Sequence, residues 1–82
     1  MSDPKKALAR EARLLGRKVR LVASPVVAPS EGAEIMLLVY DCEPLSLPSV
    51  GPMRERRWAI YLNDKPSGSG IVTTSFDERE EV

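Results

Sequence analysis

Residues 34–42 read EIMLLVYDC and contain the longest uninterrupted apolar run in the chain. Side chains of a strand point alternately to its two faces, and here both alternating sets are apolar. One set is Ile35, Leu37 and Val39, and the other is Met36, Leu38 and Tyr40. A pattern without a polar face is typical of a central strand that is covered on both sides. We therefore expect a central strand over residues 34–42.

Three further segments, residues 18–24, 57–63 and 71–76, have the period of two that indicates strands. Residues 24–32, 44–52 and 63–70 lie between them and are rich in Pro, Gly, Ser and Asn, so we expect connections there. In the first connection, Val26 and Val27 would suit a short edge bridge. The last connection predicts a flexible hairpin loop.

The N-terminal segment predicts a helix over residues 4–15. Asp3 and Pro4 are typical of a helix start, and Gly16 is typical of a left-handed C-terminal cap. Leu8, Ala12 and Leu15 follow one helical face. Glu11 falls within that apolar arc, so we expect it to meet a cation at the edge of the core.

This order of elements predicts an α+β fold in which the N-terminal helix packs on a roughly four-stranded antiparallel sheet. A small curled barrel with an N-terminal helix is the alternative. The length of 82 residues favours one small domain over residues 1–82, with an acidic, frayed tail at residues 77–82. A core of this size has modest stability, so a partner or a second copy would help. Homodimerisation through exposed sheet edges is one such arrangement.

Composition argues against common enzyme chemistry. The chain has no histidine and one cysteine, and no nucleophile–base pairing or metal cage can be assembled from its motifs. We therefore expect no enzymatic activity, no cofactor and no metal. The lone Cys42 requires no oxidising compartment, and neither a signal peptide nor a membrane-spanning run is present, so we expect a cytoplasmic protein without membrane contact.

The net charge is zero, but the charges are segregated. Seven cations face two anions within residues 1–20, whereas four anions face one cation within residues 77–82. This asymmetry predicts either two differently charged binding surfaces or a tail that masks the basic segment.

The loop at residues 44–53 carries apolar side chains on a proline-rich backbone, followed by an Arg cluster and Trp58. Exposed apolar loops and Arg beside Trp are typical of protein-binding sites. Alternatively, the loop closes one end of the core, Trp58 is buried, and the arginines pair with Asp41, Glu43 or the tail. The expected partner-binding residues are Leu45, Leu47, Val50, Met53, Arg54, Arg56 and Arg57.

A second hypothesis is nucleic-acid binding through the helix and the first strand, because clustered cations release counterions from phosphates. Arg54, Arg56 and Arg57 would add a second contact. Alternatively, the charged face of the helix is only solvated, and no known nucleic-acid-binding signature accompanies it. The residues of this hypothesis are Lys6, Arg10, Arg13, Arg17, Lys18 and Arg20.

Two weaker signals favour structural roles. Asp41 and Glu43 would share one face of a strand, but a carboxylate pair without a third ligand predicts strand-end charges, not a metal or acid–base site. Cys42 shares the face of Leu38 and Tyr40, which predicts a core thiol.

Taken together, the sequence predicts a small non-enzymatic protein-interaction module. A modulator or inhibitor of a larger protein, of the phage or mobile-element accessory type, is the form that we expect. A nucleic-acid-binding protein is the alternative.

Overall fold

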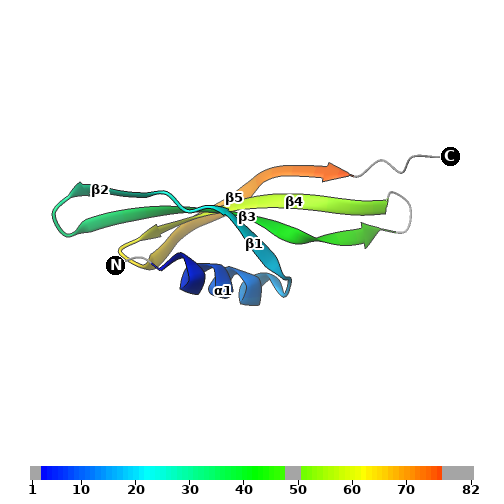
Figure 1. Ribbon diagram of the computed structural model, residues 1–82, viewed down its shortest axis with the longest axis horizontal. Coiled ribbons are helices and arrows are strands. Elements are labelled where there is room, and N and C mark those ends of the chain that lie inside the picture. Colours follow the sequence, from blue (N-terminus) through cyan, green and yellow to red (C-terminus); the bar gives the residue numbers. More distant parts are fainter. Residues whose placement is uncertain (1–2, 48–50, 77–82) are drawn as a thin grey trace.

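The computed structural model describes residues 3–47 and 51–76 of the chain. They form one helix followed by five strands in a single antiparallel sheet (Figure 1). The expected α+β class is confirmed, with one strand more than expected. The predicted acidic tail at residues 77–82 lies outside the described residues.

Helix α1 spans Pro4–Leu15, as predicted. An Asp3 carboxylate oxygen accepts a hydrogen bond from the Lys5 backbone N–H at 3.0 Å. At the other end, Gly16 adopts a left-handed conformation with φ 64°, and its N–H donates to the Ala12 carbonyl. Both ends of the helix are therefore determined by local capping interactions.

The five strands are β1 (Val19–Ala23), β2 (Val26–Ser30), β3 (Ala33–Leu47), β4 (Gly51–Leu62) and β5 (Lys65–Phe76). The sheet order is β1-β3-β4-β5, and β2 also pairs with β3. Val19 lies opposite Cys42, whereas Val26 lies opposite Met36. Strands β1 and β2 therefore follow one another along the same side of β3, and β5 is the edge strand on the other side.

The predicted connection at residues 24–32 contains strand β2, so only part of it is a connection. The edge bridge that Val26 and Val27 suited is a five-residue strand. Pro29 is tolerated because β2 is an edge strand and its pairing with β3 is already irregular between Val27 and Ser30. A tight turn at Glu31 and Gly32, with Gly32 at φ 80°, then leads into β3.

The prediction of a loop over residues 44–52 is wrong for most of that segment. Strand β3 continues to Leu47, β4 begins at Gly51, and Leu45 pairs with Met53. The register shifts by one residue between Cys42 and Leu45. Pro44 falls in this irregularity, where the ladder is already interrupted and its missing N–H costs little.

The prediction of a flexible loop over residues 63–70 is also wrong. The turn uses only Asn63 and Asp64, at φ 48° and 66°, and β5 begins at Lys65. Two residues with positive φ form the tight hairpin turn that matches the twist of antiparallel strands. Two register shifts in the pairing with β4 leave Ser67 and Val72 as extra residues of β5.

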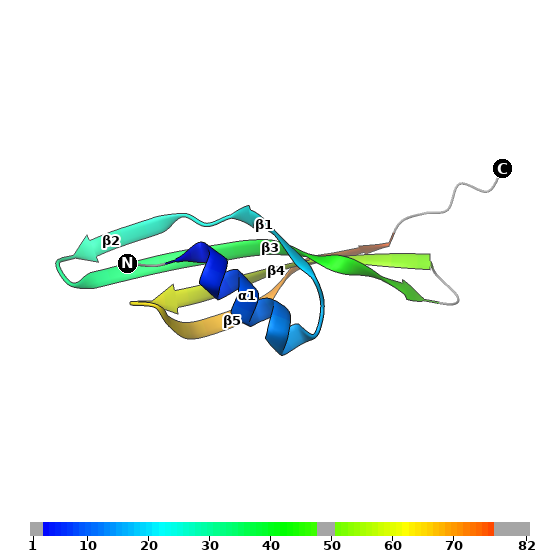
Figure 2. The ribbon, with the colours of Figure 1, turned by 60° about the horizontal axis from the view of Figure 1, so that its bottom comes forward.

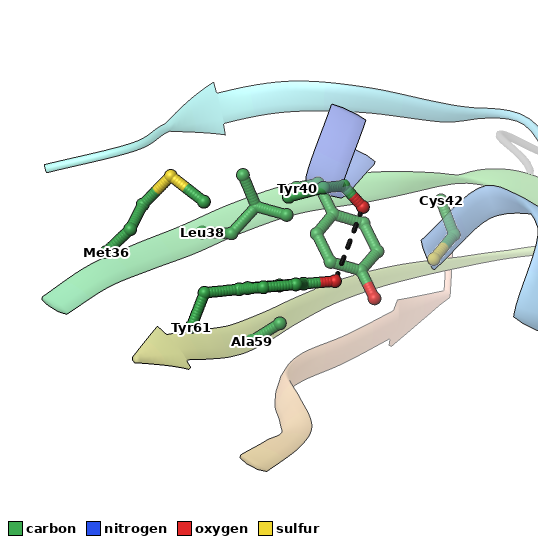
Figure 3. Packing of buried hydrophobic residues seen from close by; sticks show 7 residues of the cluster. Met36, Leu38, Tyr40, Cys42, Ala59 and Tyr61 are labelled. Atoms are coloured by element: carbon green, nitrogen blue, oxygen red, sulfur yellow. Dashed lines mark hydrogen bonds between the residues drawn. The ribbon is translucent and has the colours of Figure 1, made fainter. Parts of the chain in front are cut away.

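The sheet has two unlike faces. Helix α1 lies across one of them, which we call the helix face, and the opposite face is called the outer face (Figures 1 and 2). The core lies between α1 and the helix face of β3 and β4 (Figure 3). Its buried residues are Ala7, Met36, Leu38, Tyr40, Cys42, Ala59 and Tyr61.

Two expectations about burial are therefore wrong. Residues 34–42 are covered on the helix face alone, and Leu37 of the outer face remains 37% exposed. Trp58, which alternates with the buried Ala59, projects from the outer face and is half-buried. The reason is the number of covering elements, since one helix of 12 residues shields one face of the sheet.

Candidate functional site

An apolar strip runs along the outer face, and we call it the outer strip. It consists of three cross-strand pairs of β3 and β4, in which Ile35 faces Leu62, Leu37 faces Ile60 and Val39 faces Trp58. Leu37 and Leu62 are 37% and 43% exposed, and the other four are half-buried. Within residues 3–47 and 51–76, no segment packs over this strip, because α1 lies on the helix face (Figure 2).

Trp58 owes its position to the glycines of β5. Gly70 lies directly opposite Trp58 in the ladder, and Gly68 lies opposite Ile60. A Cβ atom at Gly70 would approach the indole nitrogen of Trp58 to 2.8 Å, so the ring occupies the space that a side chain would fill. An aromatic ring that covers strand glycines in this way shields the backbone of β5 and widens the apolar surface.

Cations gather at one end of the outer strip, which we call the basic end: Lys18 and Arg20 near β1, and Arg54 and Arg56 on β4. They line an open depression of about 410 Å³ together with Thr73 and Ser75. Asp41, Glu43 and Glu55 also line it, so three carboxylates offset much of the positive charge of the four cations.

Asp41 is the centre of an ion-pair group at the basic end. Arg56 donates two hydrogen bonds to its carboxylate, at 2.7 and 3.1 Å, and Arg20 donates one at 3.4 Å. The hydrogen bonds from Arg56 are the main reason why the pKa of Asp41 lies below its ordinary value. This carboxylate is a stable anion and a poor general base.

Anions gather at the opposite end of the sheet, which we call the acidic end. Glu31, Glu34 and Asp64 line a second depression, next to the turns that follow β2 and β4. The Asn63 side-chain oxygen accepts a hydrogen bond from the Glu34 backbone N–H at 2.8 Å and joins the turn after β4 to the start of β3. Lys65 offsets part of the negative charge.

A polar cluster fastens α1 to the helix face. The buried Glu11 carboxylate accepts hydrogen bonds from the hydroxyls of Tyr40 at 2.9 Å and Tyr61 at 2.6 Å. Burial and the bond to Glu11 raise the pKa of Tyr40 to about 12, and the pKa of Tyr61 is raised for the same reasons. Glu11 also meets Arg10 at 3.2 Å, as expected, but the tyrosines are its closer partners.

Cys42 and its neighbours also have structural roles. The thiol is buried, as predicted, and burial raises its pKa. Arg17 and Arg57 both contact Glu55, at 3.4 and 2.8 Å, and the hydrogen bond from Arg57 is the main cause that lowers the pKa of Glu55. A neutral buried thiol is a poor nucleophile.

The residues predicted for a protein-binding site do not form one surface. Arg54 and Arg56 belong to the basic end, whereas Arg57 is on the helix face and pairs with Glu55. The predicted pairing of an arginine with Asp41 is confirmed for Arg56. The apolar part was expected in a loop, but Leu45 and Met53 are paired strand residues, only the backbone of Leu47 is described, and Val50 lies outside the described residues.

The residues predicted for nucleic-acid binding are divided by the sheet. The helical residues Lys6, Arg10 and Arg13 lie on the side of α1, and Arg17 is tied to Glu55 and to the Glu43 carbonyl. Lys18 and Arg20 alone join Arg54 and Arg56 at the basic end.

The outer strip was missed in the sequence, although its signal was present. Both alternating sets of residues 35–40 are apolar, and only one segment of the chain predicts a helix. One helix leaves one such set without a cover, which indicates an exposed apolar face.

Comparisons of the chain with protein-family models, with curated proteins and with solved structures gave no match. Among the described residues, there is no helix with the length and apolar character needed to cross a membrane. Function is therefore inferred from the residues of this chain.

Proposed function

We propose that the chain is a non-enzymatic protein-interaction module whose contact surface is the outer strip. The observation that carries this proposal is the absence of any described segment over six apolar side chains of one sheet face. A contiguous exposed apolar patch with a charged rim is typical of protein-binding surfaces. Trp58 and Arg56 lie on the same face, and both residue types are enriched at binding hot spots.

The state of the reactive groups supports the non-enzymatic part of the proposal. The pKa of Cys42 is raised by burial, and the pKa of Asp41 is lowered by its arginine partners. Glu11 holds two hydroxyls beneath the helix. Each group has a structural partner or a neutral state that disfavours nucleophilic or general-base catalysis.

The test is affinity capture of the tagged chain from a lysate of its source, with and without nuclease. The strip variant carries Leu37→Asn and Leu62→Asn, two of the exposed outer positions. The matched control carries Val26→Asn and Ile71→Asn. The side chains of Val26 and Ile71 are 49% and 54% exposed, and these residues pair with the helix-face residues Met36 and Arg57, so they do not belong to the outer strip. Circular dichroism checks that both variants are folded.

We expect the wild type and the control to retain the same protein after nuclease treatment, and the strip variant to lose it. Capture that is equal for all three would overturn the role of the outer strip. Loss of every captured protein on nuclease treatment would overturn protein binding itself. Inhibition of a larger protein and a phage or mobile-element origin remain predictions from the sequence alone.

Nucleic-acid binding is the second candidate, and the basic end is the observation that favours it. Lys18, Arg20, Arg54 and Arg56 line one depression with two hydroxyl side chains. If these four cations neutralise phosphates, log affinity for a DNA duplex should fall with log salt at a slope of about −3 to −4. Fluorescence anisotropy with a labelled duplex measures this slope. A slope near zero, or no binding at low salt, rejects the candidate.

A further inference from the structure

Positive and negative charges are separated along the long axis of the sheet. The basic end and the acidic end lie at opposite ends of the sheet, and each borders one of the two depressions. At the acidic end, Glu31 and Asp64 are in the turns beyond the outer strip, whereas Glu34 alternates with Ile35 and belongs to the helix face. Strand β4 shows the spacing most simply, because Arg56 precedes Ile60 by four residues and Asp64 follows it by four. At roughly 3.3 Å per strand residue, Arg56 lies about 13 Å from Ile60, whereas Asp64 is in the turn that follows Leu62, just beyond the other end of the strand.

Strands β1 and β2, at the edge of the sheet opposite β5, repeat this arrangement. Lys18 directly precedes β1 and Glu31 directly follows β2, and the two strands lie end to end along β3. The Lys18 carbonyl bonds the Glu43 N–H, so Lys18 lies six positions beyond Leu37 on β3. Ser30 pairs with Ala33, so Glu31 lies about as far from Leu37 in the other direction.

We propose that the occupant of the outer strip is a second copy of this chain, packed face to face with its strands antiparallel. The two-fold axis passes near Leu37 and Ile60, lies between the two sheets and runs across their strands. It places β3 over β3 and β4 over β4 of the other copy, with the strand directions reversed. The basic end of each copy then lies over the acidic end of the other. The inference rests on the proposed function and names its partner.

The charges select this orientation among the two-fold arrangements of two stacked sheets. An axis parallel to the strands would place the two basic ends over one another, and opposed like charges cost free energy. The axis across the strands opposes β1 to β2, which brings Lys18 over Glu31 of the other copy, and it opposes β4 to β4, which brings Arg56 over Asp64. Each contact occurs twice, as two-fold symmetry requires.

The outer face is large enough for such a dimer. In Figure 1, α1 lies beneath the sheet along the 21 Å extent, so the outer face is bounded by the 57 and 16 Å extents, an area of roughly 900 Å². A standard stable interface buries about 800 Å² per partner. Stacked sheets keep their strand directions within about 30°, so the centre of the strip remains opposed to itself despite the twist.

The test is the mass of the full chain in solution, measured by sedimentation equilibrium over a range of protein and salt concentrations. Five proteins are compared: the wild type, the strip variant, its matched control, and the single charge reversals Lys18→Glu and Glu31→Lys. A sixth protein combines both reversals. Lys18 and Glu31 are exposed, so these substitutions leave the core intact.

We expect the wild type and the control to be dimers and the strip variant to be a monomer. Each single reversal should raise the dimer dissociation constant roughly tenfold at low salt, because an attraction becomes a repulsion at two symmetric contacts. The double reversal should restore the dissociation constant to near that of the wild type. Rescue of this kind is specific for a direct contact between the two sites.

Three results overturn the proposal. They are a wild type that is monomeric at every concentration, a dimer that the strip variant leaves unchanged, and single reversals that the double reversal does not rescue. A dimer that persists in the strip variant would indicate pairing through sheet edges. The capture experiment separates this failure from that of the proposed function. If the occupant is a second copy, the protein that the tagged chain captures through the strip is the untagged chain itself. A monomeric chain whose strip variant loses a different captured protein rejects only the second copy, whereas equal capture by the wild type, the control and the strip variant rejects the proposed contact surface.

Discussion

Replacement of Gly70 by alanine tests the packing of Trp58 on the outer face. The new Cβ would lie 2.8 Å from the indole nitrogen and 2.9 Å from two ring carbons, closer than real Cβ contacts allow. Gly68 is the matched control, because its Cβ would meet the same ring at 3.7 Å, an ordinary contact. Neither glycine has a positive φ, so alanine is compatible with the backbone at both positions.

Two opposing effects set the magnitude. A Gly→Ala change at a compatible position stabilises a protein by about 0.4–1 kcal/mol, because it restricts the unfolded chain. Overpacking costs about 1–3 kcal/mol when side chains must shift. We therefore expect Gly68→Ala to stabilise by about 0.4–1 kcal/mol and Gly70→Ala to destabilise by about 0.5–2 kcal/mol. The entropy effect is common to both variants, so their difference isolates the displacement of the ring.

The assay is urea-induced unfolding followed by circular dichroism at one fixed protein concentration, because self-association makes stability concentration-dependent. Trp58 is the only tryptophan of the chain, so its fluorescence reports ring displacement without ambiguity. Its emission should shift in Gly70→Ala and not in Gly68→Ala. In a Trp58→Ala background, Gly70→Ala should become stabilising.

Equal unfolding free energies for the two alanine variants would refute this reasoning. A destabilisation by Gly70→Ala that persists without the indole ring would refute it as well, because the cost would then belong to the backbone of β5.

Three further predictions concern the helix face. Glu11→Ala should lower the unfolding free energy by about 2–4 kcal/mol, because it leaves the buried hydroxyls of Tyr40 and Tyr61 without their acceptor; a loss below 1 kcal/mol in urea unfolding would contradict that role. The pKa of Tyr40 is about 12 in the folded state and 10.0 ordinarily, so the unfolded state releases this proton first, and stability should fall as the pH rises from about 10 to 12. Tyr40→Phe should weaken this dependence in unfolding measurements across that range. Cys42 should react with iodoacetamide far more slowly in the native protein than in urea, and equal rates would show that the thiol is accessible.

Elements with local signals were predictable from the sequence. The helix begins after Asp3 and ends before Gly16, where capping residues satisfy its own backbone groups. The central strand and the burial of Cys42 follow from alternation alone. These features depend on neighbours in the chain, so the sequence contains what is needed to locate them.

The extent of the hairpins was not predictable in the same way. Pro44 and the Ser and Gly residues of 67–70 have poor strand propensity, yet both segments pair with β4. Their pairing is imposed by neighbouring strands and accommodated by register shifts, and β propensity depends strongly on such context. The sequence also places Trp58 in a strand without indicating which face the single helix covers.

The candidate site was predictable only in part. The arginine cluster predicted from the sequence includes Arg54 and Arg56, which belong to the basic end. Their neighbour Arg57 belongs to the opposite face, because side chains alternate along a strand. The cationic surface of Lys18 and Arg20 with Arg54 depends on three strands lying side by side, which local sequence patterns do not reveal.

Ser67 and Val72, the two extra residues of β5, affect whether association between copies of the chain stops at two or continues. Residues 66–76 carry no charge, and this strand forms one edge of the sheet. A straight edge of this kind would accept the free edge of another copy and then a third, and fibres grow by that open-ended addition. Ser67 and Val72 interrupt the regular ladder and turn the edge away from such a template. Stacking of faces about a two-fold axis stops at two chains. Because the insertions disfavour pairing through the edge, they favour this closed assembly. Deletion of both residues would expose the chain to polymerisation.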